Sequence, residues 1–358
     1  MIVSRLAFLR TTGLLLAGGG VALALALGAL GWDAAPWDAA PEAAHIRGIT
    51  LDARRPPETA TLARLHDLGV THVTVIPYAF QPSKDHPEIR HNPGGQWYSE
   101  SDAGIRDLAA RLRSRGMKLI LKPQLWLRGG AWTADIAFET EADWQKWEED
   151  YREVVLHYAR LAAEVDAAML VVGTELATSV RTREAFWRGL IADVRKLYDG
   201  KLTYAANWHE DFEHVPFWDA LDFVGVQAYF PITEASDPSL EALKAGWEPH
   251  LEALARVSRR TGRPVLLTEI GYRSVPYAAA EPWRWPSRDE YGQVAPDFEL
   301  QARLFEAFFE QCWSAPWLAG AIIWKWRPEY DRASRNRDLN FTPQNKPAER
   351  VIRQWFTQ

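Results

Sequence analysis

Short apolar runs alternate with amphipathic segments along most of the 358-residue chain. The apolar runs are flanked by glycine or proline, as is typical of buried strands. The intervening segments carry apolar residues every three or four positions, which predicts helices. The predicted strands are 46–52, 72–78, 118–126, 168–176, 201–208, 223–229, 264–272 and 319–326. The predicted helices are 57–69, 101–116, 141–164, 183–198, 214–221, 240–262, 298–313 and 346–356.

This alternation predicts an α/β protein with a (β/α)8 TIM barrel, in which parallel strands are surrounded by helices. The alternative is an open doubly wound sheet, which would carry a glycine-rich phosphate turn after its first strand. The sequence has no such turn there. We therefore expect one barrel domain over residues 45–358.

The first 31 residues have a different pattern. Arg5 and Arg10 precede an uncharged stretch, 13–31, that is long enough to span a membrane. Residues 1–31 are predicted to be a signal peptide or a membrane anchor, and an uncleaved anchor is favoured because no small-residue cleavage site precedes Trp32. The Ala/Pro/Asp-rich segment 32–44 is predicted to be a linker. The barrel is then expected outside the cytoplasm, in the periplasm, at the cell surface or secreted.

Polar and aromatic residues gather where the predicted strands end. In a TIM barrel these carboxyl ends form the active site. Carboxylates and amides bind sugar hydroxyls, and indole faces stack on sugar rings. The strand-end residues are Asp52, Tyr78, Lys122, Gln124, Trp126, Glu175, Asn207, Trp208, Gln227, Tyr229, Glu269, Trp324, Lys325 and Trp326.

Two of these residues, Glu175 and Glu269, are glutamates that end buried strands. An acid is costly to bury unless it is paired or used. Glycoside cleavage uses two carboxyl groups, one that protonates the leaving oxygen and one that attacks the anomeric carbon. The alternative is that both glutamates are ion-pair partners at the barrel rim.

Four motifs add to this pattern: Gly173–Leu176, Thr268–Tyr272, Trp324–Trp326 and Phe341–Ala348. With the two glutamates they resemble the retaining glycoside hydrolases that have catalytic glutamates on strands four and seven, and most closely family 113, whose characterised members are β-mannanases. The resemblance implies that Glu175 is the acid/base and Glu269 the nucleophile. It also implies that Tyr229 orients Glu269, that Trp324 or Trp326 supports the sugar, and that Lys122, Gln124, Trp126 and Asn207 bind substrate. Many members of the clan carry Asn before the acid/base, where this chain has Thr174.

Composition and residue spacing add further constraints. The chain has 18 tryptophans, a net charge of −6 and one cysteine, Cys312. The absence of basic runs argues against nucleic acid as a partner, and the single cysteine argues against a disulfide framework. His209 and His214 are five residues apart, so one helix face would not present both to a metal, and we expect neither metal nor cofactor. The loop 79–98, with His86 and His91, is expected at the surface.

We therefore predict a monomeric retaining glycoside hydrolase acting on a β-linked polysaccharide or oligosaccharide, with β-1,4-mannan favoured. One alternative is a catalytically silent carbohydrate-binding barrel at the cell surface. The other is the same chemistry on a glucan or a xylan, because specificity depends on loop shape and single hydroxyl contacts. The amino-terminal segment would contact the membrane if it is not cleaved.

Overall fold

The computed structural model describes residues 45–92, 94–209, 211–328 and 338–358. The predicted anchor, 1–31, and the predicted linker, 32–44, lie outside the described residues. Within the described ranges, no helix is both long and apolar enough to cross a membrane. Residues Ala44–Gln358 form one compact unit.

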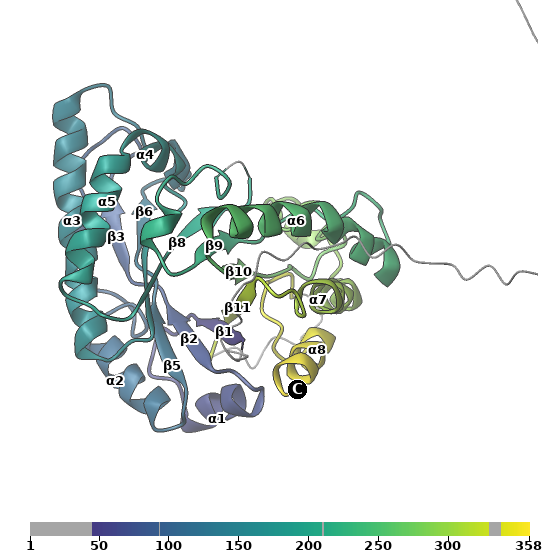
Figure 1. Cartoon of the computed structure of the whole chain (residues 1–358). Helices are drawn as coiled ribbons and strands as arrows, with labels where there is room; N and C mark the ends of the chain where they lie inside the picture. Colours follow the sequence, from purple (N-terminus) through teal and green to yellow (C-terminus); the bar gives the residue numbers. More distant parts are fainter. Residues whose placement is uncertain (1–44, 93, 210, 329–337) are drawn as a thin grey trace, which may run out of the picture. The chain divides into compact units, whose positions relative to one another are not determined.

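Eight of the described strands close into a parallel barrel, as predicted (Figure 1). Each strand pairs in parallel with its neighbours, and the last strand, β11, pairs with the first, β1. In order around the barrel the strands are β1 Ile46–Leu51, β2 His72–Val75, β5 Lys118–Leu121, β7 Met169–Thr174, β8 Lys201–Asn207, β9 Val224–Gln227, β10 Val265–Ile270 and β11 Leu318–Trp326.

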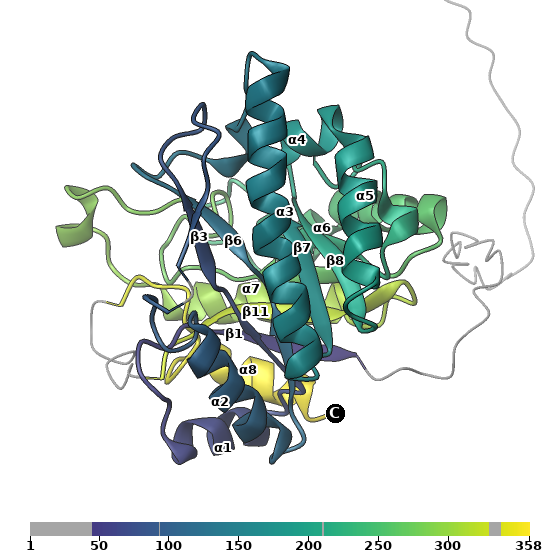
Figure 2. The same ribbon diagram turned by 90° about the vertical axis from the view of Figure 1, so that its left-hand side faces the viewer.

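Helices follow the barrel strands and cover their outer side (Figures 1 and 2). Side-chain caps mark several helix starts, because the first N–H groups of a helix lack internal partners. Thr140 Oγ1 accepts from the Asp143 N–H at 3.1 Å, and Ser101 and Ser239 act in the same way. The helices are α1 Thr59–Asp67, α2 Asp102–Arg113, α3 Glu141–Glu164, α4 Ala177–Thr182, α5 Glu184–Arg195, α6 Leu240–Thr261, α7 Phe298–Cys312 and α8 Pro347–Phe356.

The structure divides two of the predicted strands, 72–78 and 118–126, into two strands each. Pro77 separates β2 from β3 Tyr78–Gln81, and Pro123 separates β5 from β6 Gln124–Leu127. Proline has no N–H to donate to a sheet, so a continuous barrel strand is not favoured through it. β3 pairs with β6 and with β4 Arg90–His91 in a small separate sheet, and β3 and β6 lie side by side in Figure 2.

The structure also differs from the sequence prediction at two helical segments. The segment 214–221 is mostly turn, with a 3-10 helix only at Trp218–Ala220. The helix α4, directly after Glu175, was not predicted from its short sequence Ala-Thr-Ser-Val-Arg-Thr. A helix of this length carries too few periodic positions to be recognised by pattern.

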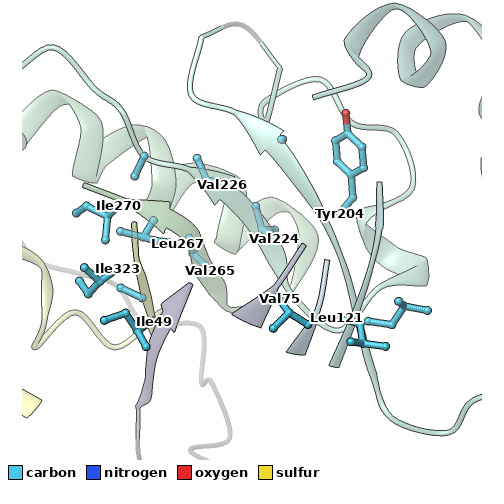
Figure 3. Packing of buried hydrophobic residues seen from close by; sticks show 14 of the residues in the cluster. Ile49, Val75, Leu121, Tyr204, Val224, Val226, Val265, Leu267, Ile270 and Ile323 are labelled. Atoms are coloured by element: carbon cyan, nitrogen blue, oxygen red, sulfur yellow. The ribbon is translucent and has the colours of Figure 1, made fainter. Parts of the chain in front are cut away.

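Alternate residues of the barrel strands build two apolar layers. Ile120, Val171 and Leu266 belong to a cluster of buried residues inside the barrel. Leu121 and Leu267 belong to the larger cluster between the strands and the helices, part of which is drawn in Figure 3. This alternation follows from the two-residue period of a strand, which buries both faces of a parallel barrel. The apolar barrel supports the polar residues at its carboxyl-terminal rim.

Candidate active site

The two predicted glutamates lie on the fourth and seventh strands of the barrel. Glu175 directly follows β7 and is half-buried, whereas Glu269 lies within β10 and is 4% exposed. Burial raises the pKa of the Tyr229 hydroxyl, just after β9, and the negative charges of both carboxylates act in the same direction. Asn207 bonds to Glu175. It is paired in the sheet with Gln227, which is paired with Glu269. Both acids therefore belong to one site.

The register of three neighbouring strands explains how the site is assembled. Asn207 of β8 is paired with Gln227 of β9, and Gln227 is paired with Glu269 of β10. These three residues therefore stand at the same height in the barrel wall. Lys122, at the end of β5, reaches across the barrel and donates to the side chains of both Gln227 and Glu269.

Both oxygens of Glu269 are held by buried donors. Lys122 is completely buried and forms an ion pair with Glu269 Oε1. Tyr229 donates its hydroxyl to Oε2 at 2.6 Å. A bond from an ammonium to one oxygen and from a hydroxyl to the other fixes the position of this carboxylate. A nucleophile requires such a fixed position.

The carboxylate of Glu175 is held by neutral donors instead. Asn207 Nδ2 donates to Oε1 at 2.5 Å, and Trp132 Nε1 donates to Oε2 at 3.0 Å. The indole of Trp132 is 43% exposed, so one side of this carboxylate is reached from solvent. A group that must exchange a proton with a substrate needs such access.

The backbone at Glu175 adopts an uncommon conformation. Its φ angle is 50°, in the left-handed region that a non-glycine residue enters at a cost of about 1–2 kcal/mol. Three hydrogen bonds hold it there: the Glu175 N–H donates to Ala205 O, Thr133 Oγ1 donates to Glu175 O, and the Leu176 N–H donates to Tyr204 Oη. The surrounding structure therefore imposes the direction of the Glu175 side chain.

Two glycines of the glutamate motifs are required by close packing. A Cβ atom at Gly173 would lie 2.7 Å from the Trp187 ring, and one at Gly271 would lie 2.4 Å from the carbonyl oxygen of Trp324. Real Cβ atoms essentially never approach other atoms so closely. The Gly-Thr-Glu and Glu-Ile-Gly patterns thus have a structural reason as well as a chemical one.

The structure separates the two tryptophans that were predicted as alternative sugar platforms. Trp326 is completely buried, and Arg64 lies over its ring, so it has no free face for a sugar. That half of the expectation is corrected: the Trp326 ring packs in the apolar cluster between the strands and the helices, where Arg64 of α1 covers it. Trp324 is half-buried, and its peptide bond to Lys325 is cis. It is the tryptophan of this strand that remains as a candidate platform.

The other predicted binding residues lie on β6 and in neighbouring segments. Trp126 is 54% exposed and meets the edge of Tyr78 at 5.7 Å between ring centroids. Gln124 is half-buried at the first position of β6. Farther along the rim, Lys325 forms an ion pair with Asp52 at 2.6 Å.

Two long loops contribute aromatic and imidazole groups. Trp283 stacks on Trp208 at 5.0 Å, and Trp285 stacks on the guanidinium of Arg273 at 3.9 Å. Both Trp283 and Trp285 keep exposed faces, of 43% and 55%. Within the segment 79–98, His91 of β4 is hydrogen-bonded to Tyr158 of α3 at 2.8 Å, whereas His86 is exposed.

Sequence reasoning missed Trp132 and gave no role to Gln227. Trp132 lies in the loop after β6, three residues beyond Gly129, and loops carry no periodicity from which its contact with Glu175 could be read. The signal that was available is the pair Gly129–Gly130, both with positive φ, which turns the chain just before Trp132. Gln227 was recognised as a strand-end residue, but its contact with Lys122 depends on the closed barrel.

A closed parallel barrel with two glutamates on its fourth and seventh strands has the architecture of a glycoside hydrolase. Residues 53–346 match the sequence profile of Glycoside Hydrolase Family 113. The chain belongs to this family and is a glycoside hydrolase.

Solved structures agree with this assignment. A GH113 β-mannanase from Alicyclobacillus acidocaldarius, in complex with ManMIm, is 30% identical, with a TM-score of 0.76 over 87% of this chain and 97% of that one. A complex of a GH113 β-1,4-mannanase is 28% identical, with a TM-score of 0.75 over 88% and 99%. A family 5 mannosidase from Rhizomucor miehei, 11% identical with a TM-score of 0.62 over 87% and 92%, shares the fold. No curated protein matches the chain.

Proposed function

We propose that this glycoside hydrolase retains the anomeric configuration and cleaves β-1,4-mannan or its oligosaccharides. The observation that carries the proposal is the contrast between the two carboxylates. Glu269 is buried against a cation, as suits a nucleophile, and Glu175 has neutral donors and an accessible side, as suits an acid/base. The mannan part is supported by the two GH113 relatives, which are described as β-mannanases.

The proposed reaction has two displacements. In the first, a carboxylate oxygen of Glu269 attacks the anomeric carbon while Glu175 gives its proton to the departing glycosidic oxygen. This leaves the sugar esterified to Glu269 and Glu175 ionised. In the second, Glu175 removes a proton from water, the water oxygen attacks the anomeric carbon, and the ester bond to Glu269 breaks. Both carboxyl groups then return to their initial states.

The residues around the glutamates receive supporting roles in this proposal. Lys122 and Tyr229 hold the charge on Glu269 as it forms and leaves the ester, which adds a role to the substrate binding expected of Lys122. Trp324 supports the sugar bonded to the enzyme, and Asn207 orients Glu175. Gln124 and Trp126, from β6, bind substrate with them.

A silent carbohydrate-binding barrel is disfavoured by the same contacts. A binding surface gains nothing from a buried glutamate held by a buried lysine, because both charges lose their hydration there. A site on another β-glycan remains the second candidate within the enzyme class, since hydroxyl contacts decide among mannan, glucan and xylan.

The test is a panel of β-mannan, β-glucan and xylan incubated with the wild-type protein and with Glu269→Ala. We expect reducing sugar from mannan with the wild type and none with the variant. Proton NMR of the first minutes of the reaction should show the β-anomer of the product. An initial α-anomer would contradict the retaining mechanism, and preferred release from glucan or xylan would contradict the proposed substrate.

We also propose that the barrel works outside the cytoplasm, on the basis of the basic and apolar pattern of residues 1–31. Fusing residues 1–44 to a periplasm-dependent reporter tests this directly. Reporter activity in intact cells supports export, and reporter activity restricted to the cytoplasm contradicts it.

A further inference from the structure

A second buried acid lies beneath the Glu175 side of the site. Asp211 follows β8 by four residues and is 1% exposed. Its Oδ2 accepts the backbone N–H of Asn207 at 3.0 Å and lies 3.5 Å from the hydroxyl of Tyr204. The chain thus turns back after β8 so that this carboxylate receives donors from the strand that precedes it.

Both partners of Asp211 are also partners of the Glu175 segment. Asn207 donates its side-chain amide to Glu175 Oε1, and the Tyr204 hydroxyl accepts the N–H of Leu176 at 2.6 Å. One route therefore reaches the carboxylate of Glu175, and the other reaches the backbone directly after it. We infer that Asp211 is a positioning residue, which fixes the orientation of Glu175 through Asn207 and Tyr204 for transfer of the proton to the leaving oxygen.

The surroundings of Asp211 set the pH at which it ionises, and its ionisation changes the strength of the hydrogen bonds that it accepts. Burial raises the pKa of Asp211 to about 6, and the negative charge of Glu175 acts in the same direction. The N–H of Asn207, the positive charge of Arg181 and the hydroxyl of Tyr204 oppose this rise. Above about pH 6 the ionised carboxylate is the stronger acceptor for its two donors, because hydrogen bonds to charged groups are stronger. Below that pH the carboxyl is protonated and its hold on both donors weakens.

The effect of Asp211 on the stability of the fold distinguishes a positioning role from a purely structural role. The pKa of Asp211 in the folded protein lies above the ordinary value of 3.8, so the folded state is stabilised by protonation. That stabilisation is complete below about pH 4 and is lost as the pH rises through 6. At pH 7 the fold therefore carries a carboxylate that opposes folding. Replacing Asp211 by the isosteric amide should relieve this penalty while weakening the support of Glu175.

The experiment compares full-length wild type with Asp211→Asn on aryl β-mannosides and aryl β-mannobiosides. Their leaving groups range from dinitrophenol, which departs without a proton, to phenol, which needs one. This inference rests on the proposed role of Glu175, so the readout is the dependence of kcat/KM on the leaving group. For the variant we expect kcat/KM to fall at least about 10-fold with phenol and less than about 2-fold with dinitrophenol. The ionisation near pH 6 in the wild-type phenyl profile should be missing.

Asp222 offers a matched control at the other end of the same strand. It accepts the backbone N–H of Leu202 at 2.8 Å, as Asp211 accepts that of Asn207, but it is paired with Arg195 and Lys201. We expect Asp222→Asn to lower Tm and to leave the leaving-group dependence unchanged. We expect Asp211→Asn to keep or raise Tm at pH 7.

A second variant covers the case in which Asp211→Asn does not fold. Tyr204→Phe removes the hydroxyl between Leu176 and Asp211, and it should reproduce the selective loss on phenyl substrates. Equal losses for all leaving groups in both variants would overturn the inference alone. No turnover of any aryl glycoside by the wild type would overturn the proposed function, and the inference with it.

Discussion

The two halves of the site hold chemically identical side chains in different surroundings. Glu269 lies within a strand, is nearly inaccessible, and is held by the ammonium of Lys122 and the hydroxyl of Tyr229. Glu175 lies just past its strand, is half-buried, and is held by an amide and an indole. The same carboxyl group thus has a buried, charged partner in one place, and neutral partners with one side open to solvent in the other.

The two halves also differ in how their backbones are supported. Glu269 lies within β10 and pairs with Gln227 of β9, although the register with both neighbouring strands shifts around it. Glu175 follows its strand, has a positive φ and is held by hydrogen bonds to β8 and to Thr133. The comparison therefore predicts that substitutions will affect the two halves unequally.

The largest effect should come from removing either carboxylate. Adding azide to each variant then distinguishes the roles of the two carboxylates. Glu269→Ala and Glu175→Ala should each lower the hydrolysis of β-mannan, the former by at least about 10⁴-fold. With an activated β-mannoside, azide should give the α-glycosyl azide with Glu269→Ala, because it replaces the nucleophile. It should give the β-product with Glu175→Ala, because the ester still forms. Mass spectrometry and NMR identify the products, and the reverse pattern would exchange the two roles.

Removal of the cation should be the next largest effect. Lys122→Met leaves Glu269 buried without its partner, which should lower the free energy of unfolding by about 3–5 kcal/mol. Chemical unfolding measures this loss. Lys146→Met is the control, since Lys146 pairs with Asp150 at the surface and is 50% exposed, so its loss should not exceed about 1 kcal/mol.

A double substitution tests the cause of that loss. Glu269→Gln removes the charge that Lys122→Met leaves unpaired. The double variant should therefore be more stable than Lys122→Met alone. If it is less stable instead, the loss arises from packing around Lys122, and the electrostatic part of the comparison fails.

One hydrogen bond can be removed from each of the two glutamates, which gives a matched pair of variants. Tyr229→Phe takes a donor from the buried Glu269, and we expect kcat to fall by about 10–100-fold. Trp132→Phe takes a donor from Glu175 at a 43% exposed position, where water can replace it, so a fall of only about 2–5-fold is expected. Steady-state kinetics on one mannooligosaccharide measure both variants. Equal falls in kcat for the two variants would mean that burial does not distinguish the two carboxylates.

The smallest effect should come from the support of the Glu175 backbone. Thr133→Val removes the hydroxyl that donates to Glu175 O at 3.0 Å, at a cost of about 1 kcal/mol in stability. We expect a small fall in kcat with it, because the strained residue is held less firmly. Thr182→Val is the control, since its hydroxyl bonds to Thr178 O within the exposed end of α4. A fall in kcat for the control of the same size would remove the link to Glu175.

The barrel and the positions of its two glutamates could be predicted because both depend on local pattern. Each barrel strand is a short apolar run, and each glutamate stands at the end of one, where the fold places active sites. The two strand divisions at Pro77 and Pro123 were missed, although the prolines were visible, because apolar residues continue on both sides of each. The anchor, the linker and the location outside the cytoplasm stay predictions.

The contacts that differentiate the two carboxylates were decided by tertiary structure. Lys122 and Glu269 are separated by 147 positions, and Trp132 and Glu175 by 43, so no local periodicity relates them. Whether Trp324 or Trp326 keeps an exposed ring likewise follows from packing against Arg64. Sequence alone determined where the acids stand, because strand ends are set by nearby residues. Only the closed barrel determined their surroundings, because closure brings distant strands to the same height.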